Sequence, residues 1–161
     1  MTFLARAAAI AAAFTLVAAS QLDAQSSKVR VTIAGGPNAG TYEKTDFCEL
    51  KDTFPSMFIM AYTVTPAPKN PRSIEFFTAP GKGKPDGFLL KVNFSEPGKS
   101  TAYEIFAIPR ELYPPGQQQA VKGKGTVTIR QAGAGRIATF RGQTADGVRI
   151  EGSVDCRNDS P

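Results

Sequence analysis

The sequence predicts an all-β protein, folded as an antiparallel β-sandwich or a partly open barrel of short strands. Three observations predict this fold class. Apolar and polar residues alternate over several short stretches, which is the pattern of a strand with one buried face. Gly, Pro and Asp form turn signals between these stretches. The extended apolar periodicity of an α-helical protein is missing from the sequence.

The chain opens with the three parts of a secretory signal peptide, which we assign to residues 1–24. Arg6 gives a positive start, and residues 7–19 form an uncharged, Ala-rich run. Cleavage is expected after Ala19 or, preferably, after Ala24. The apolar run is shorter than the roughly 20 residues of a membrane span, and no later segment is apolar enough to be one. We therefore expect a periplasmic or secreted bacterial protein with no transmembrane span in its mature chain.

The mature chain, residues 25–161, has the size of a single domain. Its two cysteines, Cys48 and Cys156, are an even count in an exported protein and predict a structural disulfide. Two free, buried thiols are the alternative. The full sequence has a formal net charge of +5, but its basic residues are scattered and no aromatic-rich RNA-binding motif accompanies them. No nucleic-acid partner is predicted.

Strands are predicted in order along the first two thirds of the chain. Residues 28–34 place Val29, Val31 and Ile33 on one face, and a Gly-rich turn then leads to a partner strand. The adjacent Phe76 and Phe77 lie in a predicted strand and must point to opposite faces. The predicted strands in this part of the chain span residues 28–34, 41–45, 57–64, 72–78, 87–94 and 101–108.

A Pro-rich stretch, residues 109–124, is predicted to be a long loop with one helical turn at 111–113. Three further strands follow, over residues 126–130, 136–141 and 148–156, and Asp146-Gly147 is a hairpin turn signal. The last strand alternates, so that Val148, Ile150, Val154 and Cys156 share one face with Gly152. Cys156 is therefore expected to point inward. The other face is predicted to carry Arg149, Glu151, Ser153 and Asp155.

The absence of His from the sequence excludes Ser-His-Asp and Cys-His catalysis and every His metal site. No metal-binding or cofactor motif is present, and no metal or cofactor is predicted. A glycoside hydrolase of the common type would need a pair of carboxylates that flank the scissile bond. Four acidic residues near Cys48 recur at a spacing of three, which we interpret as one solvated, helical face: Glu43, Asp46, Glu49 and Asp52.

Two short Gly- and Lys-rich segments are candidate sites for anionic ligands. If both lie at the same end of the sandwich, they would attract anionic envelope glycans. Solubilising loops are the alternative interpretation. The candidate anion-binding residues are Lys82, Lys84, Lys122 and Lys124. A second candidate surface is an outer face that exposes aromatic side chains, among them one of Phe76 and Phe77.

Two segments of the sequence, VTIAGGPNAGTYEKTDFC and ATFRGQTADGVRIEGSVDC, resemble parts of small exported bacterial proteins. These proteins have a Gly-rich first hairpin, a first Cys and a closing strand that ends in the second Cys. The layout also resembles the mycobacterial 19 kDa lipoprotein antigen type, although this chain lacks the lipid-bearing Cys. The resemblance implies a β-sandwich closed by Cys48 and Cys156, with no known catalysis.

Together these observations predict an exported, non-enzymatic binding or envelope-associated module. Its expected partner is an anionic envelope glycan or an envelope protein. Two alternatives stay open: a small carboxylate-based hydrolase acting on glycans, and a structural accessory subunit of an envelope complex. The hydrolase would need two carboxylates converging in a cleft, roughly 5 to 10 Å apart. The accessory subunit would need a large apolar outer patch.

Overall fold

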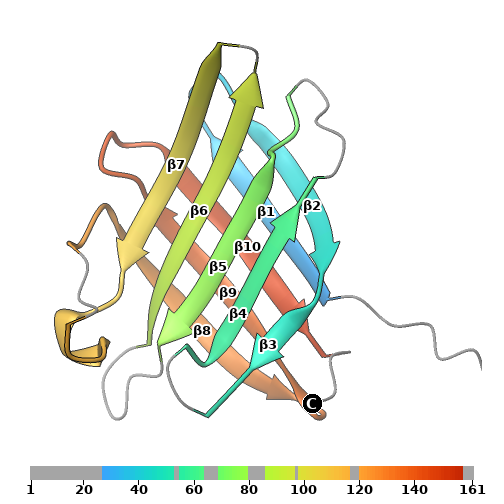
Figure 1. Cartoon of the computed structure of the whole chain (residues 1–161), viewed down its shortest axis with the longest axis vertical. Helices are drawn as coiled ribbons and strands as arrows, with labels where there is room; N and C mark the ends of the chain where they lie inside the picture. Colours follow the sequence, from blue (N-terminus) through green and yellow to red (C-terminus); the bar gives the residue numbers. More distant parts are fainter. Residues whose placement is uncertain are drawn as a thin grey trace, which may run out of the picture.

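The computed structural model describes residues 27–52, 55–63, 69–79, 86–96, 98–116 and 120–157. The predicted signal peptide lies outside these ranges, and so do Lys82 and Lys84. Within them, two antiparallel sheets of five strands each pack face to face, and their strands cross in the view of Figure 1. The predicted fold class, an antiparallel β-sandwich, is confirmed.

The first sheet has the strand order β2-β1-β10-β9-β8, and every neighbouring pair is antiparallel. It contains the two hairpins predicted near the ends of the chain. Its strands are β1 Ser27–Ala34, β2 Gly40–Asp46, β8 Lys124–Ala132, β9 Gly135–Gln143 and β10 Arg149–Cys156.

The second sheet has the strand order β3-β4-β5-β6-β7 and is an antiparallel meander. Four of its strands match predicted ones, whereas the three-residue β3 was not predicted. Its strands are β3 Cys48–Leu50, β4 Met57–Tyr62, β5 Ser73–Ala79, β6 Gly87–Glu96 and β7 Lys99–Ala107.

The two sheets are linked along both of their edges. Phe47 alone separates β2 from β3, so the chain passes directly from the first sheet to the second. At the opposite edge, Phe106 and Lys122 form an isolated bridge, in which the Phe106 amide donates to the Lys122 carbonyl at 2.8 Å. The strands therefore follow one another around the sandwich in the order of the sequence.

The core between the sheets is centred on three phenylalanine rings. Phe76 on β5 stacks on Phe140 of β9 with ring centroids 5.1 Å apart, and Phe88 of β6 lies 5.7 Å from Phe140. All three rings are at most 2% exposed. The apolar residues of β1 pack against the same cluster, as their alternation predicted. Burial of these rings is a main source of the stability of the sandwich.

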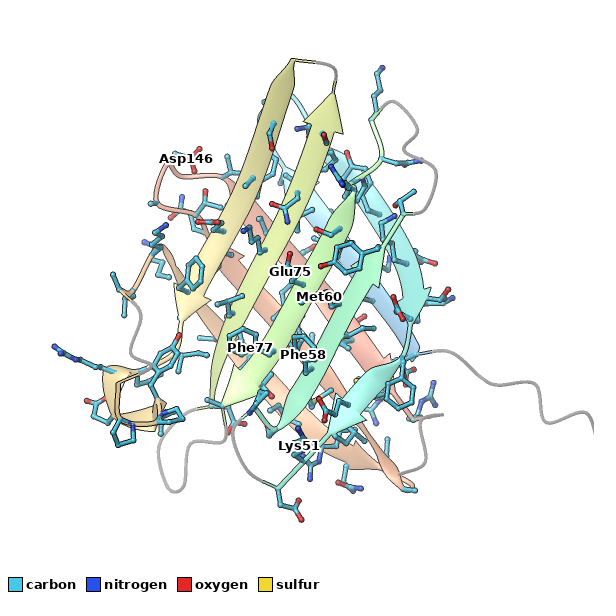
Figure 2. All side chains as sticks on the ribbon, in the orientation of Figure 1. Lys51, Phe58, Met60, Glu75, Phe77 and Asp146 are labelled. Carbon is cyan, nitrogen blue, oxygen red and sulfur yellow. A yellow bond between two sulfur atoms is a disulfide. The ribbon has the colours of Figure 1, made fainter. Side chains whose placement is uncertain are left out.

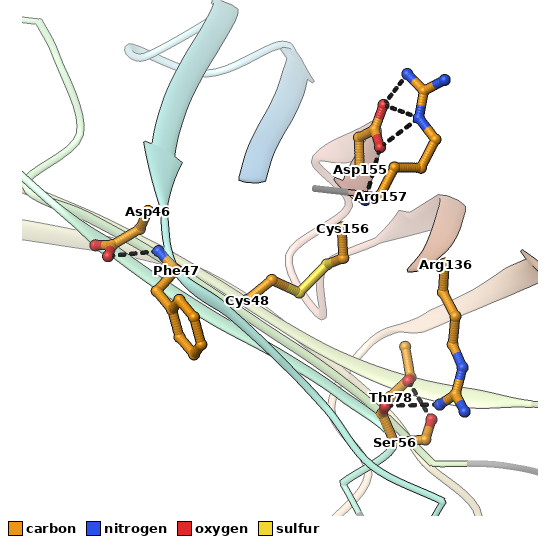
Figure 3. Close-up of a disulfide and its surroundings, with 9 residues drawn as sticks. All are labelled: Asp46, Phe47, Cys48, Ser56, Thr78, Arg136, Asp155, Cys156 and Arg157. Atoms are coloured by element: carbon orange, nitrogen blue, oxygen red, sulfur yellow. Dashed lines mark hydrogen bonds and ion pairs between the residues drawn. A yellow bond between two sulfur atoms is a disulfide. The ribbon is translucent and has the colours of Figure 1, made fainter. Parts of the chain in front are cut away.

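The predicted disulfide between Cys48 and Cys156 is present and joins the two sheets (Figure 3). Cys48 begins β3 and Cys156 ends β10, and neither is more than 1% exposed. The inward direction predicted for Cys156 is confirmed. The bond spans a sequence separation of 108, and in the chain-entropy model a loop of this length stabilises the fold by about 4 to 5 kcal/mol.

The segment after β7 covers one end of the outer face of the second sheet. It contains the 3-10 turn η1, Arg110–Leu112, close to the predicted helical turn. Ile108 and Tyr113 pack with Ala79 and Leu89 in a small second apolar cluster. Within the described ranges, no helix has the length and apolarity required to cross a membrane.

Candidate functional site

The outer face of the first sheet is polar, and its side chains lie in rows that run across the strands. Residues paired on neighbouring antiparallel strands point to the same face, so each row follows from the strand register. The central row consists of Thr32, Glu151, Arg141 and Thr126, from β1, β10, β9 and β8. The neighbouring row, here called the basic row, consists of Arg149, Gln143 and Lys124, from β10, β9 and β8.

Two adjoining hollows on this face form a groove. The first hollow, of about 660 Å³, extends from the central row to the basic row. The second, of about 590 Å³, extends in the opposite direction toward Arg30 and Ser153. All four residues of the central row line both hollows, so the groove is centred on this row.

Glycines on the inner side of β9 and β10 form part of the floor of the groove. A Cβ atom at Gly142 would lie 2.7 Å from the Lys124 carbonyl oxygen and 2.9 Å from Ile105 Cδ1. At Gly152 it would lie 2.1 Å from the Arg30 carbonyl oxygen and 2.7 Å from Phe140 Cζ. Glycine thus lets the neighbouring backbone and the core side chains approach closely on the inner side of these strands.

The groove carries an excess of positive charge. Arg141, Arg149 and Lys124 line the first hollow, and Glu151 is the only carboxylate among the residues that line either hollow. Among the described residues, no carboxylate forms an ion pair with any of these three cations. Their charges are therefore available to an incoming anion.

The other carboxylates on this face lie outside the groove and are already paired. Glu43 on β2 lies 3.6 Å from Lys28 Nζ and 3.6 Å from Arg30 Nε. Asp155 on β10 accepts a hydrogen bond of 2.6 Å from Arg157 Nη2, and this bond lowers the pKa of the Asp155 carboxyl below its usual value. Both carboxylates are therefore largely neutralised by neighbouring cations.

The strand register also sets the spacing of the three unpaired cations. Arg149 and Lys124 lie in one row with a strand between them, so their Cα atoms are about 10 Å apart. Arg141 lies two residues along β9 from that row, which places its Cα atom about 8 Å from each of the other two. The Cα atoms of the three cations form an open triangle at one end of the groove.

Of the four lysines predicted to bind anions, the structure describes Lys122 and Lys124. Lys124 lines the groove. Lys122 lies at the edge of the second sheet, where its Nζ donates to Glu104 Oε2 at 3.1 Å and lies 5.4 Å from the centroid of the Phe106 ring. An anion that binds Lys122 would have to compete with Glu104, whereas Lys124 has no such partner among the described residues.

The helical face predicted for the acidic residues near Cys48 is wrong. Glu43 and Asp46 lie on β2, and Glu49 lies on β3, because the pairing of these strands with β1 and β4 overrides the three-residue spacing. The carboxylates are also engaged separately. Glu49 pairs with Lys51 at 2.6 Å, and Asp52 pairs with Arg136 at 2.7 Å.

The second candidate surface, an aromatic outer face, lies on the second sheet. Figure 2 shows Phe58, Met60, Glu75 and Phe77 on this face, on β4 and β5. The rings of Phe58 and Phe77 are 6.4 Å apart, and Tyr62 on β4 is 57% exposed. The prediction that Phe76 and Phe77 point to opposite faces is confirmed, since Phe76 is fully buried in the core.

Sequence reasoning placed the outward residues of β10 on one face but did not predict the groove. Two signals in the sequence point to it. Arg149 and Glu151 alternate with buried residues of β10, and Gly142 and Gly152 lie within β9 and β10 although glycine weakens a strand interior.

Within the described ranges, no three His, Cys, Asp or Glu side chains come together as metal ligands.

Comparisons with family models, with curated proteins and with solved structures find no match to this chain.

Proposed function

We propose that the mature protein is an exported, non-enzymatic module that binds an anionic envelope glycan in the groove of the first sheet. The observation that carries the proposal is the triangle of cations without ion-pair partners among the described residues: Lys124, Arg141 and Arg149. Unpaired cations that line one hollow attract and orient anionic groups.

The uncharged residues of the groove also suit a glycan. The hydroxyls of Thr32 and Thr126 lie at the two ends of the central row, and Gln143 stands between Arg149 and Lys124. Hydroxyl and amide side chains both donate and accept hydrogen bonds, as sugar hydroxyls do. The groove thus combines charge with polar groups that match a carbohydrate surface.

The residues of the groove favour binding over hydrolysis. Glycoside hydrolysis by the common mechanism needs two carboxylates facing the scissile bond. Glu151 has no carboxylate partner among the residues that line the two hollows. Export is supported by the signal-peptide pattern of residues 1–24 and by the disulfide, which persists in oxidising compartments.

The proposal is tested by titrating the purified mature protein with sparsely carboxymethylated dextran, in which uncharged sugars separate the carboxylates, at low and at moderate salt, with neutral dextran as the ligand control. The double variant Arg141→Gln/Arg149→Gln is expected to lose about fivefold to thirtyfold in affinity at low salt, since each lost ion contact contributes roughly 0.5–1 kcal/mol. Binding by the unmodified protein is expected to weaken as salt rises.

The matched control is Arg110→Gln/Lys122→Gln, which removes the same net charge from residues that do not line the groove. Arg110 is exposed on η1, and Lys122 is paired with Glu104. This variant is expected to bind the carboxymethylated dextran nearly as well as the unmodified protein. An equal loss in both double variants would mean that net charge rather than the groove governs binding, and would contradict the proposal.

A further inference from the structure

We propose that the groove selects acidic glycans whose anionic groups are separated by uncharged sugars, and that Glu151 is the residue that rejects dense polyanions such as polyphosphate. This inference rests on the proposed function and specifies the ligand of the same groove. The observation behind it is that the Glu151 carboxylate lies among the three cations of the groove, Lys124, Arg141 and Arg149.

Glu151 lies in the middle of the groove. It belongs to the central row, with Thr32 on one side and Arg141 on the other, and it lines both hollows. Arg149 lies two residues before it on the same face of β10. Glu151 forms no ion pair or hydrogen bond with a described side chain, even though it faces Arg141 across the β9–β10 ladder. Its exposed carboxylate therefore stays available to a ligand.

An unpaired carboxylate at this place discriminates between ligands by the density of their charge. A polymer with an anionic group at every repeat would bring one of those groups next to Glu151, and like charges repel. A glycan can place hydroxyl groups there instead. A carboxylate accepts hydrogen bonds from such hydroxyls, and bonds to a charged acceptor are roughly twice as strong as neutral ones.

The spacing of the cations supports the same class of ligand. Arg149 and Lys124 lie on strands that flank β9, with Cα atoms about 10 Å apart, and Gln143 rather than a cation stands between them. A ligand that lies along this row and contacts both cations also passes Gln143, whose amide suits uncharged, hydroxyl-bearing groups. An acidic polysaccharide with a carboxylate on every second sugar has this alternation of anionic and hydroxyl-bearing units.

The experiment compares two polymers on the intact mature protein. Hyaluronate carries one carboxylate on every second sugar, and polyphosphate carries a charge at every repeat. The unmodified protein is expected to bind hyaluronate more tightly at equal ionic strength. In Glu151→Gln, the ratio of hyaluronate affinity to polyphosphate affinity is expected to fall about twofold to fivefold, the range set by one exposed charge contact. Circular dichroism of the variant confirms that the exposed substitution leaves the sandwich intact.

Glu111→Gln is the matched control, because it removes the same charge from an exposed position on η1. Its affinity ratio is expected to equal that of the unmodified protein. An unchanged ratio in Glu151→Gln, or tighter binding of polyphosphate by the unmodified protein, would overturn the selectivity. The proposed function would still stand if Arg141→Gln/Arg149→Gln weakened binding. Failure of both polymers and of carboxymethylated dextran to bind would overturn both proposals.

Discussion

Gly152 lets β10 pack closely against β1 and the core, at the scale of a single residue. It lies within β10, where the Arg30 carbonyl oxygen and the Phe140 ring leave no space for a side chain. Gly152→Ala is expected to destabilise the protein by about 1 to 3 kcal/mol, since an inserted methyl group forces the backbone or the core to shift. The free energy of unfolding in urea measures this loss.

The neighbouring change Ser153→Ala is the control for Gly152→Ala, because Ser153 lines the groove on the outer side of the same strand. It is expected to change the free energy of unfolding by less than about 0.5 kcal/mol. Equal effects of the two substitutions would show that β10 does not lie as close to the core as described.

Asp155 gives a residue-scale prediction for the effect of pH. Its pKa is lowered in the folded protein, chiefly by the hydrogen bond from Arg157. A carboxyl with a lowered pKa stabilises the fold above its unfolded pKa, and this contribution is lost as pH falls through the folded pKa. Asp155→Asn is therefore expected to lower the free energy of unfolding at pH 7 but to leave it unchanged near about pH 2. A difference that persists at the acidic pH would point to packing rather than to charge.

At the scale of strands, the sequence predicts the elements whose residues alternate and misses those that do not. Residues 28–34 and 148–156 alternate cleanly, and they match β1 and β10. The three residues of β3 are too few for alternation to emerge. β8 is longer than predicted at both ends, because pairing with β9, and not apolar periodicity, sets its limits.

The groove is harder to predict than the strands, because it depends on how the strands are aligned. Alternation places Arg149 and Glu151 on one face of β10, but it does not place Arg141 beside Glu151. The pairing of Arg141 with Glu151 follows from the register of β9 against β10. Hairpin length and core packing determine that register together. The anion-binding residues predicted from the sequence were chosen for local charge. Of the two that the structure describes, Lys124 lines the groove and Lys122 does not.

Arg136 joins the first sheet to the connection between β3 and β4. From β9, its Nη1 donates to the carbonyl oxygens of Lys51 at 2.7 Å and Ser56 at 3.0 Å, and its Nη2 donates to Asp52 Oδ1 (Figure 3 shows Arg136 beside Ser56). Arg136→Lys is expected to destabilise the protein by about 1.5 to 3 kcal/mol, because an ammonium group lacks the planar fork that reaches these acceptors.

The variant Asp52→Asn removes the ion pair of Arg136 but leaves its hydrogen bonds to the two carbonyl oxygens. The Asp52 side chain is 97% exposed, so its removal is expected to cost less than about 0.5 kcal/mol. Urea unfolding of both variants is the measurement. A larger loss in Asp52→Asn than in Arg136→Lys would show that the ion pair, and not the carbonyl contacts, holds this connection.

At the scale of the whole molecule, the disulfide joins the two sheets near one end of the sandwich. Cys48→Ser/Cys156→Ser is expected to lower the free energy of unfolding by about 2 to 5 kcal/mol, with the native strand content retained. Urea unfolding followed by circular dichroism gives both quantities. A variant as stable as the oxidised protein would mean that core packing alone sets the stability.

The groove also depends on the whole molecule, since it needs four strands from both ends of the chain to lie side by side. The most direct test of its role is to map the binding of a short hyaluronate oligosaccharide on the isotope-labelled mature protein by NMR. The account predicts amide shift changes concentrated at Thr32, Thr126, Arg141, Arg149 and Glu151, with the outer face of β4 and β5 unaffected. Shift changes confined to the face of Phe58 and Phe77, or none at saturating concentrations of the oligosaccharide, would contradict it.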